Sequence, residues 1–182
     1  MRFVETLGMV AKRLKFIDES GTHLGLTRLF GRAAPGQRIV EDTPGYSGPH
    51  YTLVATLGWK EVTAPWIFEG TMDRVAFEAY VRSQLLPTLR RGDIVVMDNL
   101  SAHTGQTIRQ LIEARGARVQ FLPPYSSDFN PIELCWSKIK TALRAAKART
   151  FDALLEALVK ALRSISLTDI QDWFAHCGYA LS

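Results

Sequence analysis

Residues 93 to 136 decide the fold, because they hold two short apolar runs that each lead into polar residues. The first run lies in DIVVMDNL (93–100) and the second in RVQFLPPYSSDFNPIELCW (118–136). Short runs rich in β-branched residues are typical of strands buried on both faces of a sheet. Asp98 and Asn99 directly follow the first run. We therefore expect Asp98 at the carboxyl end of a strand, where open α/β sheets bind their ligands.

A helix start follows the second run. Two prolines end the strand predicted at 118–122, and Asn130-Pro131 then supplies a cap residue and a proline in the favoured first positions of a helix. Glu133 falls in the first turn, where the helix dipole stabilises a carboxylate in any protein. The other interpretation is that Glu133 converges on one metal site with Asp98, from which it is separated by the 34 residues 99–132.

The composition fits one globular domain. The 182 residues are 47% hydrophobic and 22% charged, which allows a substantial core, and the net charge of +4 is on the side expected for nucleic-acid binding. Cys135 and Cys177 lack disulfide or zinc spacing and are expected to be reduced core thiols. No run approaches the roughly 18 apolar residues that span a bilayer, and no signal peptide is evident, so we expect a cytoplasmic protein without a membrane partner.

The first 70 residues predict antiparallel strands. The stretch LKFIDESG (14–21) alternates and then ends in acids and a glycine, which indicates a strand that enters a turn. Further strands are predicted at 27–32, 50–59 and 66–69. Because the links between them are too short for helical crossovers, we expect an antiparallel meander.

Asp18 and Glu19 are both candidates for a site at the first strand. Neighbouring strand residues point to opposite faces, so only one of the two can share a site with Asp98. We select Asp18, because it follows an apolar pair as Asp98 does. The alternative is that Asp18 is only an acidic turn residue.

After residue 71, the spacing of the apolar residues changes to that of a helix. Apolar residues recur at helical spacing behind a Thr71 or Asp73 cap until Pro87. A strand is then predicted at 93–98, and helices at 103–115, 130–149, 151–164 and 168–176. The antiparallel meander thus has three or four strands. With three, these elements predict an α/β fold with a five-stranded mixed sheet, whose first three strands are antiparallel, and with helices on both faces. This is the ribonuclease-H-like architecture.

Three blocks of the sequence resemble those of mariner-like DDE transposases of bacterial insertion sequences. They are FIDESG (16–21), VVMDNLSAH (95–103) and LPPYSSDFNPIELCW (122–136). The resemblance extends over residues 14 to 150, and the last two blocks are the most specific. It implies metal-dependent hydrolysis and strand transfer of DNA phosphodiester bonds during transposition.

The resemblance also implies the catalytic residues and the cofactor. Asp18, Asp98 and Glu133 would be the catalytic acids and would hold two Mg²⁺ or Mn²⁺ ions. Two such ions, about 3.5 to 4 Å apart, require several oxygen ligands, which three carboxylates from separate elements can supply. Asn99 and His103 are candidates for orienting a ligand or contacting a phosphate, although a histidine at a helix start often makes only a local hydrogen bond.

Other candidates would contact DNA. Tyr125 and Asn130 lie in the block before Glu133, whose DFNP turn is alternatively only a helix cap. Lys140, Arg144 and Lys147 recur at i, i+4 and i+7 and would form a basic stripe for phosphates, although a solvated helix face has the same pattern.

The implied partners are double-stranded DNA, as transposon ends and as a target with a TA dinucleotide, and a second copy of the chain in the active complex. Members of the family carry helix-turn-helix modules ahead of the catalytic domain, and nothing before Asp18 is long enough for one. We therefore expect residues 1–182 to be a catalytic domain alone, acting with a separate helix-turn-helix partner. Two alternatives stay open: a catalytically silent, domesticated or remnant DNA-binding domain, and another ribonuclease-H-like nuclease.

Overall fold

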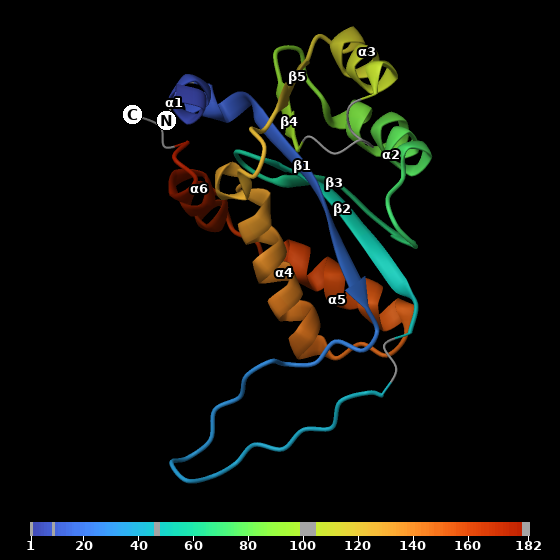
Figure 1. The fold of residues 1–182 in the computed structure, drawn as a ribbon, viewed down its shortest axis with the longest axis vertical. Coiled ribbons are helices and arrows are strands. Elements are labelled where there is room, and N and C mark those ends of the chain that lie inside the picture. The colour runs from blue at the N-terminus through green and yellow to red at the C-terminus, as the bar shows by residue number, and fades with distance from the viewer. Residues whose placement is uncertain (1, 9, 46–47, 99–104, 180–182) are drawn as a thin grey trace.

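A five-stranded sheet forms the centre of the molecule in the computed structural model, which describes residues 2–8, 10–45, 48–98 and 105–179 (Figure 1). The strands are β1 (Leu14–His23), β2 (His50–Gly58), β3 (Val62–Glu69), β4 (Ile94–Met97) and β5 (Arg118–Phe121). Their order is β3-β2-β1-β4-β5. β1, β2 and β3 pair antiparallel, whereas β4 and β5 add parallel to β1. The predicted mixed sheet is therefore confirmed.

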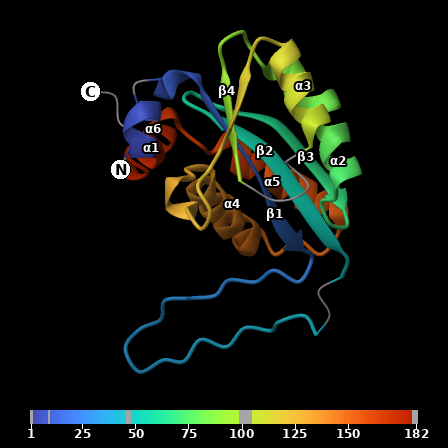
Figure 2. The same cartoon turned by 45° about the horizontal axis from the view of Figure 1, so that its top comes forward.

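Helices cover both faces of this sheet, as Figure 2 shows. They are α1 (Arg2–Gly8), α2 (Arg74–Tyr80), α3 (Gln106–Ala114), α4 (Ile132–Ala146), α5 (Phe151–Arg163) and α6 (Leu167–His176). Short helical turns are η1 (Ala11–Arg13), η2 (Val81–Leu85), η3 (Leu86–Thr88) and η4 (Ser127–Phe129). In the described part of the chain, none of the helices has both the length and the apolar character needed to cross a membrane.

The two faces of the sheet bury separate apolar clusters. Leu14 and Phe16 of β1 pack against residues of α4, α5 and α6, whereas Ile17 packs with α2 and α3 on the other face. This division follows from the alternation of side chains along a strand. The ring of Phe16 contacts those of Phe174 and Tyr179, with centroids 5.4 and 5.2 Å away, so the end of the chain packs directly on β1.

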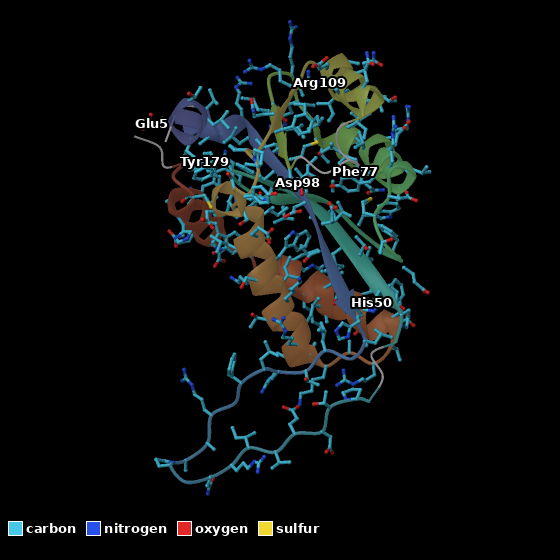
Figure 3. The ribbon with its side chains drawn as sticks, in the orientation of Figure 1. Glu5, His50, Phe77, Asp98, Arg109 and Tyr179 are labelled. Atoms are coloured by element: carbon cyan, nitrogen blue, oxygen red, sulfur yellow. The ribbon has the colours of Figure 1, made fainter. Side chains whose placement is uncertain are left out.

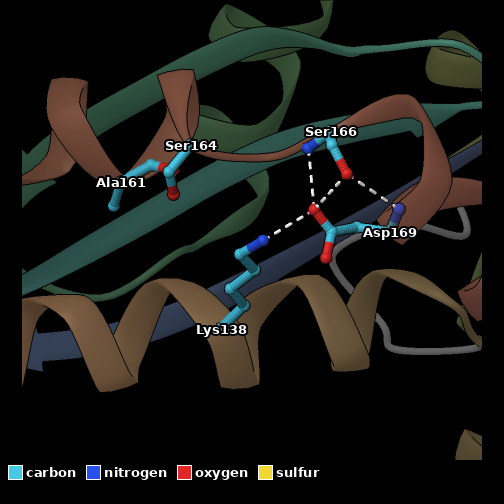
Figure 4. Close-up of polar contacts among 5 residues, drawn as sticks. All are labelled: Lys138, Ala161, Ser164, Ser166 and Asp169. Carbon is cyan, nitrogen blue, oxygen red and sulfur yellow. Dashed lines mark hydrogen bonds and ion pairs between the residues drawn. The ribbon is translucent and has the colours of Figure 1, made fainter.

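Polar side chains fix where several helices begin. The carboxylate of Asp73, one of the two predicted cap residues, accepts a hydrogen bond from the Ala76 amide and caps α2. Ser166 and Asp169 form a capping box at the start of α6. Asp169 also accepts a 2.6 Å hydrogen bond from Lys138 Nζ, so α6 is tied to α4 (Figure 4). These hydrogen bonds lower the pKa of Asp169 to about 2.

Two strand predictions were wrong. The segment 27–32 forms no strand; it belongs to a long loop between β1 and β2 that projects from the body (Figures 1 and 2). No described strand pairs with that segment, and an isolated extended segment has no ladder to stabilise it. In addition, β1 does not turn at Gly21 but continues to His23, because β2 pairs with it along its whole second half.

Candidate active site

Three carboxylates from separate elements line one pocket of about 510 Å³. Asp18 comes from the middle of β1, Asp98 follows the last residue of β4, and Glu133 lies in the first turn of α4. Figure 3 labels Asp98 near the centre of the molecule, where β4 ends beside β1. The other lining residues are Leu122, Pro123, Pro124, Tyr125, Ser126, Ser127 and Asn130.

Strand register explains why the two aspartates meet. β4 pairs with β1 so that Leu14 lies beside Ile94 and Phe16 beside Val96. The same parallel register, continued by two residues, sets Asp98 beside Asp18. Both side chains then face the side of the sheet that α4 covers, since alternation places them with Phe16. Asp18 is thus an inner residue of β1 that lies next to the end of β4, rather than a strand-end residue as predicted.

The carboxylate of Asp18 is buried and held by two donors. It is 8% exposed, and it accepts hydrogen bonds from the Glu19 amide (2.8 Å) and from Asn130 Nδ2 (3.1 Å). Burial, and then the nearby charge of Glu133, raise the pKa of Asp18 to about 8. Asp98 is half-buried and Glu133 is exposed. The site therefore combines one fixed, desolvated carboxylate with a half-buried one and an exposed one.

Asn130 has a different role from the predicted helix cap. Its side chain does not bond to the α4 backbone; its amide donates to Asp18 instead. The backbone carbonyl oxygen of Asn130 accepts a hydrogen bond from the Glu133 amide (3.1 Å). Asn130 therefore connects β1 to the first turn of α4 and sets the spacing of two of the three acids.

Sequence reasoning missed Tyr179. Its side chain is completely buried, and its hydroxyl donates a 2.8 Å hydrogen bond to the carbonyl oxygen of Phe129, the residue before Asn130. Figure 3 shows Tyr179 beyond the end of α6. No motif pointed to Tyr179, and only its place after Gly178, at a helix end, sets it apart in the sequence.

Tyr125 stands on the rim of the same pocket. Its side chain is fully exposed, and its backbone adopts the left-handed conformation with a φ of 56°. The hydroxyl of Ser126 donates to the carbonyl oxygen of Pro124 (3.2 Å). This contact and the two prolines before Tyr125 restrict the turn that carries it.

The predicted basic stripe is interrupted. Lys140 and Arg144 are half-buried on α4, but Lys147 ends the helix in the left-handed conformation and forms an ion pair with Glu41. Arg144 lines a separate cavity together with Phe30 of the loop between β1 and β2. A DNA-binding role of these residues stays a prediction. Asn99 and His103 lie outside the described residues.

The donor chemistry of the pocket fits a hard divalent cation. Carboxylate and amide oxygens, which Asp18, Asp98, Glu133 and Asn130 provide, are the ligands that Mg²⁺ and Mn²⁺ prefer. Nevertheless, no three Asp, Glu, His or Cys side chains in the described part of the chain are arranged to hold a metal ion. Because the Glu133 side chain is exposed and long, it can rotate toward the two aspartates.

Comparisons with known proteins identify the family and the fold. The family model of the DDE superfamily endonucleases matches residues 13–155. A search of curated proteins found no significant relative.

Among solved structures, the fold resembles that of the Mos1 mariner transposase. The Mos1 strand transfer complex has a TM-score of 0.72 at 16% identity over 97% of this chain and 56% of that chain. The Mos1 paired end complex with Mg has 0.69 at 16% over 97% and 58%, and the Mos1 catalytic domain has 0.65 at 12% over 97% and 83%. The chain thus spans just over half the length of the Mos1 chain in these complexes.

The match of the family model covers well over half of the sequence, and the fold is the ribonuclease-H-like one that was expected. The chain therefore belongs to the DDE superfamily endonucleases.

Proposed function

We propose that this chain is the catalytic domain of a DNA transposase, which cuts and joins phosphodiester bonds with the help of divalent metal ions. The observation that carries the proposal is the convergence of Asp18, Asp98 and Glu133 on one pocket. These acids come from three elements that are far apart in the sequence. Carboxylates that share a site repel each other when they are ionised, and a positive charge between them would offset this repulsion. Membership of an endonuclease family supports the same chemistry.

Each acid has a distinct part in the proposed site. Asp18, fixed by the Glu19 amide and by Asn130, would be the preorganised ligand against which the other two close. Asp98 follows a rigid strand, and Glu133 can change rotamer at the start of α4. When bound, Mg²⁺ or Mn²⁺ would activate the attacking water or DNA 3′ hydroxyl and stabilise the leaving 3′ oxygen.

We further propose double-stranded DNA as the substrate. The similar Mos1 structures are named as a strand transfer complex and as a paired end complex with Mg. Lys140 and Arg144 lie on the helix that begins beside the acids, so a DNA backbone that leaves the pocket along α4 would meet both. A second copy of the chain, a TA target and a helix-turn-helix partner for end recognition complete the proposal.

Nicking and strand joining on transposon-like DNA duplexes test this function. We expect activity with Mg²⁺ or Mn²⁺ in the wild type, and a loss of roughly a thousandfold or more in Asp98→Asn and in Glu133→Gln, because each removes a charged metal ligand. Calorimetric titration of Mn²⁺ gives an independent readout, in which both variants should bind weakly or not at all.

The control is Asp172→Asn, which removes a carboxylate from the exposed side of α6 and should change neither readout. A wild-type chain that binds DNA but neither binds Mn²⁺ nor cuts would contradict the proposal and favour a catalytically silent DNA-binding domain.

A further inference from the structure

The same pocket is lined by a second group of residues with a different chemistry. They are Leu122, Pro123, Pro124 and Tyr125, on the segment between β5 and η4, and we call them the apolar wall. The described residues that line the pocket include no Lys or Arg. Apolar and aromatic groups give no hydrogen bonds or charge to a phosphate, but they pack well against the faces of sugars and bases. The acids and the apolar wall thus suit two different parts of one nucleotide.

Tyr125 is the aromatic side chain of this wall, and it is presented to solvent. Its ring is fully exposed, although burial of a tyrosine ring is normally favourable. Its left-handed backbone is uncommon for a residue other than glycine and costs free energy. The turn around it is restricted by two prolines and by the hydrogen bond from Ser126 to Pro124. Because the backbone that carries the ring is restricted in this way, little backbone entropy is lost when the ring binds a ligand.

We propose that Tyr125 binds an unpaired nucleobase next to the scissile phosphate by stacking on its face; this inference rests on the proposed function. A base inside a duplex has both faces covered by its neighbours, so only a base that has left the stack, or one at a strand end, can contact the ring. The phosphate of that nucleotide would lie at the acids while its base lies on Tyr125. Since every base has a π face, Tyr125 selects for an unpaired base rather than for a sequence.

A binding measurement tests this without any chemistry. The probe is a fluorescein-labelled DNA duplex with a short 3′ overhang of thymidines, compared with the same duplex whose overhang carries abasic residues. Anisotropy is followed in Ca²⁺ at low salt. We expect the wild type to bind the thymidine overhang roughly ten- to a hundredfold more tightly than the abasic one, as base–aromatic stacking predicts. Tyr125→Ala should bind both probes equally, at the level of the abasic one.

Two conservative variants and one control sharpen the result. Tyr125→Phe and Tyr125→Trp keep an aromatic face and should keep the preference for bases. Val75→Ala removes an exposed apolar side chain from α2 and should behave as wild type. All variants are first compared by circular dichroism and thermal unfolding, which Tyr125→Ala should leave unchanged because Tyr125 has no buried side-chain contacts to lose.

Three outcomes would overturn the inference. The wild type could bind both probes equally or bind neither, Tyr125→Ala could weaken both to the same extent, or Tyr125→Phe could behave as Tyr125→Ala, which would assign the effect to the hydroxyl. None of these outcomes depends on cleavage. If the base preference is present while Mn²⁺ binding and strand cutting fail, the stacking site stands and the proposed catalytic function falls.

Discussion

Two long loops of this molecule each connect elements of the fold, but they differ in how they lie against its body. The segment 122–131 between β5 and α4, which we call the anchored loop, has no strand or long helix, yet hydrogen bonds hold it to the body at both ends. The Leu122 amide donates to Met97 O, Asn130 donates to Asp18, and Phe129 O accepts from Tyr179. The segment 24–49 between β1 and β2 projects from the body (Figure 1).

Side chains also hold the projecting loop, near its start and at Glu41. Arg149 Nη1 donates to the carbonyl oxygens of Leu24 (2.8 Å) and Leu26 (2.9 Å), and Lys147 pairs with Glu41. Between them, Phe30 is 88% exposed. Both loops therefore have long-range anchors, but those of the anchored loop end on β1, on β4 and on Tyr179, and this loop carries residues of the candidate site.

The largest effect is expected from removing the Tyr179 anchor. Tyr179→Ala deletes a completely buried ring that packs on Phe16 and should lower the free energy of unfolding by about 3 to 5 kcal/mol. Tyr179→Phe keeps the ring and loses only the hydrogen bond to Phe129, which should cost about 1 kcal/mol. Urea unfolding measures both. Equal losses in the two variants would show that the ring packing contributes little.

Asn130→Ala should have an intermediate effect on stability and a strong one on the proposed activity. It leaves the buried Asp18 carboxyl group with one donor fewer, at a cost of about 1 to 2 kcal/mol. It also removes the contact that positions Asp18 relative to the start of α4, so the rate of strand cutting should fall at least roughly tenfold. Asn130→Asp is the matched partner, since it keeps the shape but adds a repelling charge. Full activity in Asn130→Ala would contradict the positioning role of the anchor.

Proteolysis compares the two loops directly. Chymotrypsin cleaves after aromatic residues, and Phe30 and Tyr125 are both exposed. We expect cleavage after Phe30 well before cleavage after Tyr125, because a protease needs a segment that can extend into its cleft and the anchored loop cannot do so. Mass spectrometry of early fragments identifies the order. The cleaved chain should keep a melting temperature within a few degrees of the intact one; early cleavage after Tyr125 would show that the anchors do not hold.

The smallest effect is expected from the ion pair between Lys138 of α4 and Asp169 of α6. The pKa of Asp169 lies at about 2 in the folded chain, below its ordinary value, so the ion pair stabilises the folded state at neutral pH and is lost as the pH falls from about 4 toward 2. Since Lys138 and Asp169 are partly exposed, the gain is small. Asp169→Asn should therefore melt slightly below the wild type at pH 6, and the difference should vanish near pH 2. A constant difference across this range would contradict the assignment to the charge.

The sequence predicted most of the sheet and the helices after residue 71 that could be compared with it, because the spacing of apolar residues and the capping residues act within a few positions. Asp73, one of the two predicted cap residues, caps α2, and the apolar run at 94–97 forms β4. The strand predicted at 27–32 was wrong, since a strand needs a partner that local sequence does not specify. The lead-in to α3, with Asn99 and His103, lies outside the described residues.

For the candidate site too, some features follow from local sequence and others only from the tertiary structure. Local sequence determined that Asp98 follows a buried strand and that Glu133 opens a helix, since each depends on its own neighbours. Only the tertiary structure decided that Asp18 lies beside Asp98, through the register of β1 and β4. It also decided that Asn130 bonds to Asp18 across 112 positions, and Tyr179 to Phe129 across 50. The physical reason is that strand pairing and buried hydrogen bonds join residues that are distant in the chain, whereas propensities and caps act only between near neighbours.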